Sequence, residues 1–353
     1  MTQGDLSESK SVFSVAVIGA GISGMIAART LVDRGLNVTV FEKSRGVGGR
    51  MATRRGENGS SYDHGAQYFT ALDPLFRRFV ETWLKQGLVS EWPVKALRND
   101  QRIVVIKNGR IESESDSVKR FVGVPAMNSV CKAMGHGLEV VKRIRIVQIE
   151  QVVGHGLSLI DSEGVSVGSF DRLIVSAPAE QASELLCNFK VLQDQVSAIQ
   201  MNPCWATMVT FREPISNDWA GAFLHDSFLS WASRNSTKPG RSGAVEDLVL
   251  HAVPAWTAKN WERDNASVAR EMLDEFWRIT GISPLSPERI QAHRWKYAIA
   301  VEPPSAPCFF DPTAGIAACG DWANGSRIEG AFLSGLAAAN RVVDSLLGDD
   351  DNA

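Results

Sequence analysis

The chain is poor in the residue patterns that build several common kinds of functional site. Its 353 residues include five cysteines at wide spacings with no CxxC pair, which gives no framework for disulfide bonds or a zinc site. This cysteine usage favours reduced thiols and a cytoplasmic location. The six histidines form no HExxH or similar motif, so no bound metal is expected, and the missing GxSxG elbow argues against a serine hydrolase.

A charge excess of one sign and long hydrophobic runs are also missing. The formal net charge is −3, whereas a general nucleic-acid binder usually shows a strong excess of basic residues. No run of about 18 apolar residues occurs, so no membrane span is expected, and the polar first ten residues do not match a signal peptide. Because 44% of the residues are apolar, the chain can bury a sizeable core in one large or two ordinary domains.

A dinucleotide-binding fingerprint opens the chain. The apolar run 15–18 indicates a buried parallel strand, and residues 19–24, GAGISG, follow it at once as GxGxxG. Apolar residues at helical spacing then predict a helix up to Arg34, and a second strand over 38–41 ends in Glu42. Because strand, glycine turn, helix and second strand come in this order, the pattern favours a dinucleotide site over a simple glycine turn.

Each residue of the fingerprint has a physical role. Gly19 allows the tight turn, Gly21 lets the backbone approach a pyrophosphate, and Gly24 packs the helix on the strand. Glu42 lies 18 residues after Gly24, near the spacing of about 20 for a carboxylate that binds ribose hydroxyls. The phosphates would lie at the amino end of the helix, and the motif does not distinguish NAD from FAD.

The loop SRGVGGRMATRR, residues 44–55, follows this second strand and has little hydrophobic periodicity. In a dinucleotide fold such a loop returns toward the pyrophosphate. Gly48 and Gly49 would permit the close approach, and Arg50 would contact a phosphate directly. Arg54 and Arg55 are expected at the surface, either solvated or paired.

A second strand–loop–helix unit is predicted near the carboxyl end. Residues 315–321, GIAACGD, predict a small apolar strand ending in Asp321, and an alanine-rich helix is expected from Gly330 to about Leu347. Asp321 could bind ribityl or ribose hydroxyls, and the helix start near Gly330 could face the pyrimidine edge of a flavin. Taken alone, this segment could equally be an ordinary terminal strand–helix unit.

These segments together resemble the glutathione-reductase-like FAD proteins of the flavin amine oxidase superfamily. The resemblance is carried by residues 15–55 and 315–342, and residues 171–178, DRLIVSAP, resemble the strand by which the chain re-enters the FAD domain. It implies an α/β fold: a Rossmann-like FAD-binding domain, split in sequence, and an α+β substrate domain with an antiparallel sheet.

Two further motifs, YDHGAQYFT at 62–70 and HRWKYA at 293–298, look like those of the renalase family. This resemblance implies a noncovalent FAD and a dinucleotide substrate, the 2- and 6-dihydro isomers of NAD(P)H. Hydride would pass to the flavin and then to O₂, giving NAD(P)⁺ and H₂O₂. Carried over by motif, the implied FAD contacts are Ser23, Arg50, Gln67 and Tyr68.

The candidate substrate pocket consists of Tyr68, Trp295 and Tyr297, together with His64. All three tyrosines of the chain fall in the two renalase-like motifs, and a tyrosine offers a flat apolar wall with one polar tip. A dihydropyridine loses hydride without a strong base, so no general base is assigned. Without the resemblance, the aromatic residues would be read as core and His64 as a hydrogen-bonding loop residue.

Other functions stay open at this point. Some amine oxidases of this superfamily attach flavin through a cysteine near the carboxyl-terminal motif, but Cys319 lies inside an apolar strand, where a small buried residue is the simpler interpretation. Amine oxidation, a desaturase-like FAD reaction and a non-catalytic flavin-binding protein are the alternatives. The sequence leaves the oligomeric state open.

The predicted organisation alternates between two domains. The FAD-binding domain takes residues 11–75, 140–190 and 306–348, and the substrate domain takes 76–139 and 191–305. A hairpin is expected to turn at Asn108-Gly109, a helix over 266–279 and a flexible loop over 235–246, NSTKPGRSGAVE.

Overall fold

The computed structural model describes residues 13–93, 102–114, 118–152, 154, 156–241 and 245–350. Its first sheet has six strands in the order β19-β20-β13-β1-β2-β9. All neighbours are parallel except β19 and β20 at the edge. The strands are Ser14–Ile18 (β1), Asn37–Glu42 (β2), Glu139–Lys142 (β9), Arg172–Val175 (β13), Phe309–Asp311 (β19) and Ile316–Ala318 (β20). Strands from three distant parts of the chain therefore lie side by side.

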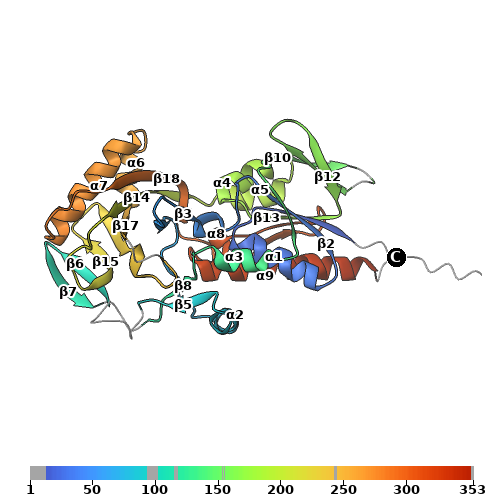
Figure 1. The fold of residues 1–353 in the computed structure, drawn as a ribbon. Coiled ribbons are helices and arrows are strands. Elements are labelled where there is room, and N and C mark those ends of the chain that lie inside the picture. Colours follow the sequence, from blue (N-terminus) through green and yellow to red (C-terminus); the bar gives the residue numbers. More distant parts are fainter. Residues whose placement is uncertain are drawn as a thin grey trace, which may run out of the picture.

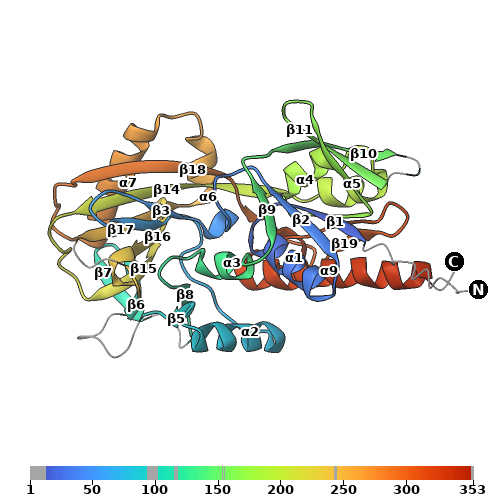
Figure 2. The ribbon, with the colours of Figure 1, turned by 45° about the vertical axis from the view of Figure 1, so that its right-hand side comes forward.

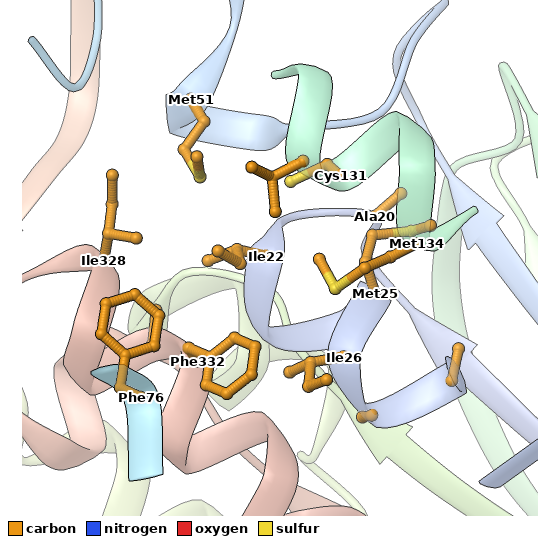
Figure 3. Packing of buried hydrophobic residues seen from close by; sticks show 14 of the residues in the cluster. Ala20, Ile22, Met25, Ile26, Met51, Phe76, Cys131, Met134, Ile328 and Phe332 are labelled. Carbon is orange, nitrogen blue, oxygen red and sulfur yellow. The ribbon is translucent and has the colours of Figure 1, made fainter. Parts of the chain in front are cut away.

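Helices cover this sheet because small residues let them pack closely. Helix α1 (Ile22–Asp33) lies along α9 (Ile328–Asp350), as Figures 1 and 2 show. At Gly335 an added Cβ would lie 2.1 Å from the Ser23 carbonyl oxygen, so the contact requires glycine. Figure 3 shows Ile22 and Ile26 of α1 next to Phe332 of α9 in one buried cluster. Helices α2 (Pro74–Lys85) and α3 (Ser129–Met134) add Phe76 and Met134 to it.

The second large sheet has seven strands in the order β18-β14-β17-β16-β15-β6-β7, antiparallel except for the parallel pair β15–β6. Helix α7 (Asn265–Thr280) packs on it, and Asp264 caps this helix by accepting from the backbone N–H groups of Ala266 and Ser267. The strands are Arg102–Lys107 (β6), Arg110–Glu114 (β7), Met201–Phe211 (β14), Trp219–His225 (β15), Leu229–Arg234 (β16), Glu246–Ala252 (β17) and Arg289–Ala300 (β18).

Two long strands lead from one large sheet to the other, and smaller elements complete the fold. In Figure 2 the long strands β14 and β18 run from the seven-stranded sheet toward the six-stranded one. A three-stranded sheet and two two-stranded sheets complete the strands: β10 (Ile146–Val152), β11 (Gly156–Asp161), β12 (Ser166–Phe170); β3 (Thr53–Arg55), β4 (Ser61–Asp63); β5 (Val89–Glu91), β8 (Phe121–Gly123). The other helices are α4 (Ala179–Leu185), α5 (Lys190–Ser197), α6 (Pro254–Lys259) and α8 (Asp321–Asn324), with single 3₁₀ turns at Gly49–Met51 and Asn235–Thr237.

This mixed α/β architecture, with a Rossmann-like part and a sheet-rich second part, confirms the predicted fold class. The hairpin at Asn108-Gly109 and the predicted helix over 266–279 are also present. The helix expected from Gly330 begins two residues earlier, at Ile328. The exact domain boundaries stay a prediction, and residues 11 and 12 of the first segment lie outside the described residues.

One sequence prediction needs a correction. Residues 235–246 were expected to form a flexible loop, and residues 238–241 do lie outside helices and strands, but two long side chains of the segment are held in the interior. The Lys238 side chain is 0% exposed and that of Arg241 is 1% exposed, because both form ion pairs with Asp63. Residues 242–244 of the predicted loop lie outside the described part.

The structure also bears on the expectations about membrane spans and cysteines. In the described part of the chain, no helix is long and apolar enough to cross a membrane. All five cysteines fall within that part, and each is a free thiol.

Candidate functional site

A cavity of about 2150 Å³ lies where the two large sheets meet. It opens at the carboxyl ends of β1 and β2, the edge at which parallel α/β sheets bind ligands. The seven-stranded sheet contributes its far wall through β14, β17 and β18. The predicted site residues that line this cavity are Gly19, Gly21, Ser23, Glu42, Gly49, Arg50, His64, Tyr68, Trp295, Tyr297 and Asp321.

The amino end of α1 faces the cavity with free backbone donors. Gly21 is the N-cap residue and supplies no side-chain cap, so the first N–H groups of the helix have no side-chain partner. A Cβ added at Gly21 would meet nothing within 4 Å, so the glycine leaves space for a ligand at this point. This arrangement fits a bound phosphate.

The glycine-rich loop at 48–49 lies directly against that turn. Gly48 N donates to the Ala20 carbonyl oxygen at 2.8 Å, and a Cβ at Gly49 would lie 3.3 Å from the Gly21 Cα. Gly48 and Gly49 have φ angles of 121° and 52°, which side chains rarely tolerate. The two glycines therefore let the loop and the helix turn close one side of the cavity together.

Glu42 and the pair Arg50–Asp321 place charge along the same side. The buried Glu42 carboxylate accepts from the backbone N–H groups of Ala20 at 2.8 Å and Ser44 at 2.7 Å. Arg50 forms a bidentate pair with Asp321 at 2.8 and 2.5 Å and also donates to the Ala298 carbonyl oxygen. The structure thus joins Arg50, from the amino-terminal loop, to Asp321, at the start of α8.

Three of the predicted residues do not line the cavity. Gly24 packs α1 on the sheet, since a Cβ there would lie 1.9 Å from the Gly19 carbonyl oxygen. Gly330 packs α9 against α8, while its neighbours Ile328, Glu329 and Ala331 reach the cavity. Gln67 is buried behind the wall, where its amide nitrogen donates to the Asp63 carbonyl oxygen.

A cluster of rings forms the wall around His64. The ring centroid of His64 lies 5.0 Å from that of Trp295 and 5.1 Å from that of His293. Trp295 Nε1 donates to the His64 carbonyl oxygen at 2.9 Å. Burial, followed by the charges of His293 and Arg54, lowers the pKa of His64 to about 3, and burial with Arg54 lowers the pKa of His293 to about 4. Both imidazoles are therefore neutral near pH 7.

The other predicted aromatic residues also line the cavity, but apart from this cluster. Tyr68 lies 5.4 Å from Trp231 between ring centroids, and the Arg120 guanidinium lies over the Tyr68 ring at 5.2 Å. The ammonium group of Lys296 lies 5.1 Å from the ring centroid of Tyr297. Flat faces and nearby cations thus border the cavity on more than one side.

Behind the wall lies a buried ion cluster. Asp63 binds Lys238 at 3.1 Å and Arg241 at 2.5 Å. Burial alone would raise the pKa of Asp63, but the two cations outweigh burial and hold it below its usual value. Burial lowers the pKa of Lys238 to about 8. Lys238 also donates to Gln67 Oε1 at 3.3 Å, so this cluster supports the segment 63–68 from behind.

The cavity lining has a strong excess of positive charge. Eleven lysines and arginines line it against four acidic residues, Glu42, Glu184, Asp321 and Glu329, although the whole chain carries −3. Arg54 and Arg55, expected at the surface as solvated or paired side chains, are both in this lining, and no carboxylate pairs with either in the described ranges. Within those ranges, no cluster of His, Cys, Asp and Glu suits a metal ion.

Sequence reasoning missed two features that the structure brings to the site. His293 lines the cavity together with Trp295 and Tyr297. Alternate residues of a strand point to the same face, so the two-residue period could have predicted that His293 belongs to the site. The burial of Lys238 and Arg241 had no such signal, because it depends on Asp63, 175 residues away from Lys238 in the chain.

The chain matches two protein-family models. The model described as an NAD(P)-binding Rossmann-like domain matches residues 17–83, and the model described as flavin containing amine oxidoreductase matches residues 115–343. The second match alone covers more than half of the chain.

Curated relatives match over short segments. Protoporphyrinogen oxidase 2, chloroplastic/mitochondrial, of Arabidopsis thaliana is 50% identical over 60 residues, which is 17% of this chain and 12% of that protein. The flavin-containing amine oxidase B of Homo sapiens is 50% identical over 74 residues, 21% of this chain and 14% of that protein. The matched segments therefore span only about an eighth of these relatives' length.

The similarity of the fold extends over nearly the whole chain. Cyclohexylamine oxidase from Brevibacterium oxydans IH-35A superimposes with a TM-score of 0.71 at 14% identity, covering 95% of this chain and 100% of that one. At this identity the likeness concerns the fold alone.

Proposed function

The chain belongs to the flavin containing amine oxidoreductase family, and on this premise we propose that it is an FAD-dependent oxidase of the renalase type. Its substrates would be the 2- and 6-dihydro isomers of NAD(P)H. Each turnover would remove a hydride from the dihydropyridine and, with O₂ and one proton, yield NAD(P)⁺ and H₂O₂.

The residues at the amino-terminal side of the cavity fit a dinucleotide flavin. The uncapped start of α1 with Ser23 would hold the pyrophosphate, Glu42 a ribose, and Arg50 with Asp321 the ribityl and phosphate region. When bound, FAD accepts the hydride and passes the electrons to O₂. The 0% exposed Cys319, whose pKa burial raises to about 12, is not in the cavity lining, which supports noncovalent binding.

The observation that carries the substrate assignment is the excess of positive charge in the lining. A pyrophosphate of FAD neutralises part of it, and a second dinucleotide would neutralise more, whereas a cationic amine would be repelled. The same cavity has flat aromatic walls at Tyr68, Trp295 and Tyr297, which suit a planar ring. Anionic and planar groups are both present in a dihydronicotinamide dinucleotide.

The chain's own residues would act by positioning. Trp295 is held by its hydrogen bond to the His64 carbonyl oxygen, and Tyr68 is packed against Trp231, so both rings are fixed before a ligand arrives. The neutral imidazoles of His64 and His293 can donate or accept hydrogen bonds without carrying charge. No residue needs to remove a proton from carbon, because a dihydropyridine supplies the electrons for hydride loss.

Amine oxidation is the second candidate, because relatives such as human amine oxidase B match this chain over 74 residues. The carboxylates that line the cavity argue against a cationic amine substrate, because most of them already have partners. Glu42 accepts two backbone N–H bonds, Asp321 is paired with Arg50, and Glu329 accepts from the backbone N–H groups of Leu72 and Asp73. Glu184, which is exposed, is the one other acidic lining residue in the described part. An ammonium substrate would therefore find few free carboxylates.

The deciding experiment is anaerobic mixing of the FAD-loaded protein with the 2- and 6-dihydro isomers of NAD(P)H while the visible flavin band is followed. Rapid bleaching, reversed by air with formation of H₂O₂, is expected. If the isomers leave the band unchanged and amines bleach it, the substrate assignment is wrong and amine oxidation replaces it.

The flavin assignment has its own test. Glu42→Ala and Arg50→Ala are each expected to lower the FAD content of the purified protein. Arg102→Ala, at an exposed ion pair with Asp218 outside the cavity, is the control. Full flavin content in both cavity variants would contradict the assigned contacts.

A further inference from the structure

A corner of the cavity gathers one arginine and two imidazoles from three separate segments. Arg54 lies on β3, His64 follows β4, and His293 lies on β18 of the seven-stranded sheet. Arg54 Nη2 is 3.5 Å from His293 Nδ1, and the centroids of the two imidazole rings are 5.1 Å apart. All three residues line the cavity, and together they are called the Arg54 corner below.

The guanidinium of this corner has no counter-charge. Across the described ranges no carboxylate lies within ion-pair distance of Arg54, and its charged neighbours are Arg45 and Arg289. Burial, followed by these two arginines, lowers the pKa of Arg54, but a guanidinium remains protonated in proteins. A partly buried cation with like-charged neighbours is stabilised by a bound anion.

Of the two imidazoles, His293 adds a hydrogen-bond donor and His64 packs beside it. His64 is only 5% exposed, and its ring packs edge-on against that of His293, so it forms the buried side of the corner. At His293, the guanidinium can only donate to Nδ1, which leaves the hydrogen on Nε2. Nε2 can then donate to the same anion.

From this geometry we infer that the Arg54 corner binds a phosphate group of the substrate. The inference rests on the proposed function, in which the substrate is a dinucleotide with a pyrophosphate. The flavin is the other source of phosphate, but its predicted phosphate contacts are Ser23 and Arg50. The Arg54 corner instead adjoins Trp295, whose ring centroid is 5.0 Å from that of His64, and so belongs to the wall that would meet the substrate ring.

The test measures the binding of ADP-ribose to the FAD-loaded protein by isothermal titration calorimetry. This probe carries the pyrophosphate but has no hydride to give. Arg54→Gln is expected to raise Kd at least about tenfold, because a charged hydrogen bond is lost. Arg54→Lys keeps the charge without the planar fork and should fall between Arg54→Gln and the wild type. The folded state of each variant is checked by circular dichroism.

The matched control is Arg212→Gln. Arg212 directly follows β14 in the seven-stranded sheet, is 82% exposed and lies outside the cavity lining. Its replacement therefore removes the same positive charge without changing the Arg54 corner. Its Kd for ADP-ribose should equal that of the wild type. An equal loss of affinity in the control would mean that general charge, and not the corner, attracts the probe, and would overturn the inference.

Three further results would also overturn it. The first is a wild-type protein that does not bind ADP-ribose, and the second is an Arg54→Gln variant that keeps its FAD and has an unchanged Kd. The third is an Arg54→Gln variant that loses FAD but, once reloaded, binds ADP-ribose normally, because the guanidinium would then serve the flavin. Binding through Arg54 without bleaching by either dihydro isomer would support the corner and reject only the proposed dinucleotide oxidation, leaving another phosphate-bearing substrate.

Discussion

Two groups of basic side chains near the cavity differ in their electrostatic surroundings. Lys238 and Arg241 are fully buried and share one carboxylate, Asp63, at 3.1 and 2.5 Å. Arg54 and Arg55 line the cavity, and in the described part of the chain neither has a carboxylate partner. Because burying an unpaired charge is expensive, the first group requires its partner for the fold itself. The second group remains near water and is available to a ligand.

The comparison separates charges that serve stability from charges that serve binding. Both groups follow from tertiary contacts. The sequence suggested a flexible loop for 235–246 and surface positions for Arg54 and Arg55, and of these two arginines Arg55 is exposed whereas Arg54 is half-buried. Removing a member of the buried group should therefore change the free energy of unfolding. Removing Arg54 should change ligand affinity instead.

Asp63→Asn is expected to have the largest effect. It leaves Lys238 and Arg241 buried without a counter-charge, which should lower the free energy of unfolding by about 3–5 kcal/mol. Urea unfolding with saturating FAD measures this loss. Asp218→Asn, which breaks the exposed pair with Arg102, is the control and should change stability by less than about 1 kcal/mol. Equal losses in the two variants would show that the buried cluster does not stabilise the fold.

Lys238→Met should have a smaller effect on the same measurement. The remaining pair, Asp63 and Arg241, is balanced in charge, and methionine keeps most of the apolar volume of lysine. The loss should be about 1–2 kcal/mol, from the hydrogen bonds to Asp63 and Gln67. A loss as large as that of Asp63→Asn would mean that charge balance does not explain the cluster.

The pH dependence of stability tests the buried imidazole of the Arg54 corner. The pKa of His64 is about 3 in the folded protein, below its ordinary 6.5, so the unfolded chain takes up the proton first. Stability should therefore fall as the pH drops from about 6.5 toward 3, by up to about 1.4 kcal/mol per pH unit for this residue. His64→Gln should reduce that slope, and an unchanged slope in this variant would contradict the assignment.

Arg54→Gln should have the smallest effect on stability. Arg54 has like-charged neighbours and no ion pair in the described residues, so its removal should change the free energy of unfolding by less than about 0.5 kcal/mol. A loss of several kcal/mol, measured in the same urea titration, would place Arg54 with Lys238 and Arg241 and remove the distinction between the two groups.

Much of the Rossmann-like part could be predicted, because its motif residues lie close together in the sequence. Gly19, Gly21 and Gly24 follow one strand within a few residues, and Glu42 ends the next, so short-range spacing describes the whole turn. The strand at 172–175 was expected from the family resemblance, and the helix starting near Gly330 from its alanine-rich sequence. Gly330 itself and Gln67 were placed in the site but lie outside the cavity lining, because motif membership does not specify which side of a wall a residue occupies.

The far wall could be predicted only in part. Trp295 and Tyr297 were assigned from a motif, and His293 followed from the same strand period but was not used. The partners of Asp63 could not be predicted from the sequence, since Lys238 and Arg241 are 175 and 178 positions away from it in the chain. A polar, glycine-containing segment such as 235–241 has the composition of a loop whether or not a buried carboxylate holds it.

The sequence by itself therefore determined the α/β class, the glycine turn and the chemical types at the site, because these depend on backbone geometry and apolar periodicity within short segments. The tertiary structure alone decided which charges are paired, which face the cavity and which histidines are neutral. Those properties depend on burial and on distances between residues far apart in the chain, and electrostatic energies change steeply with both.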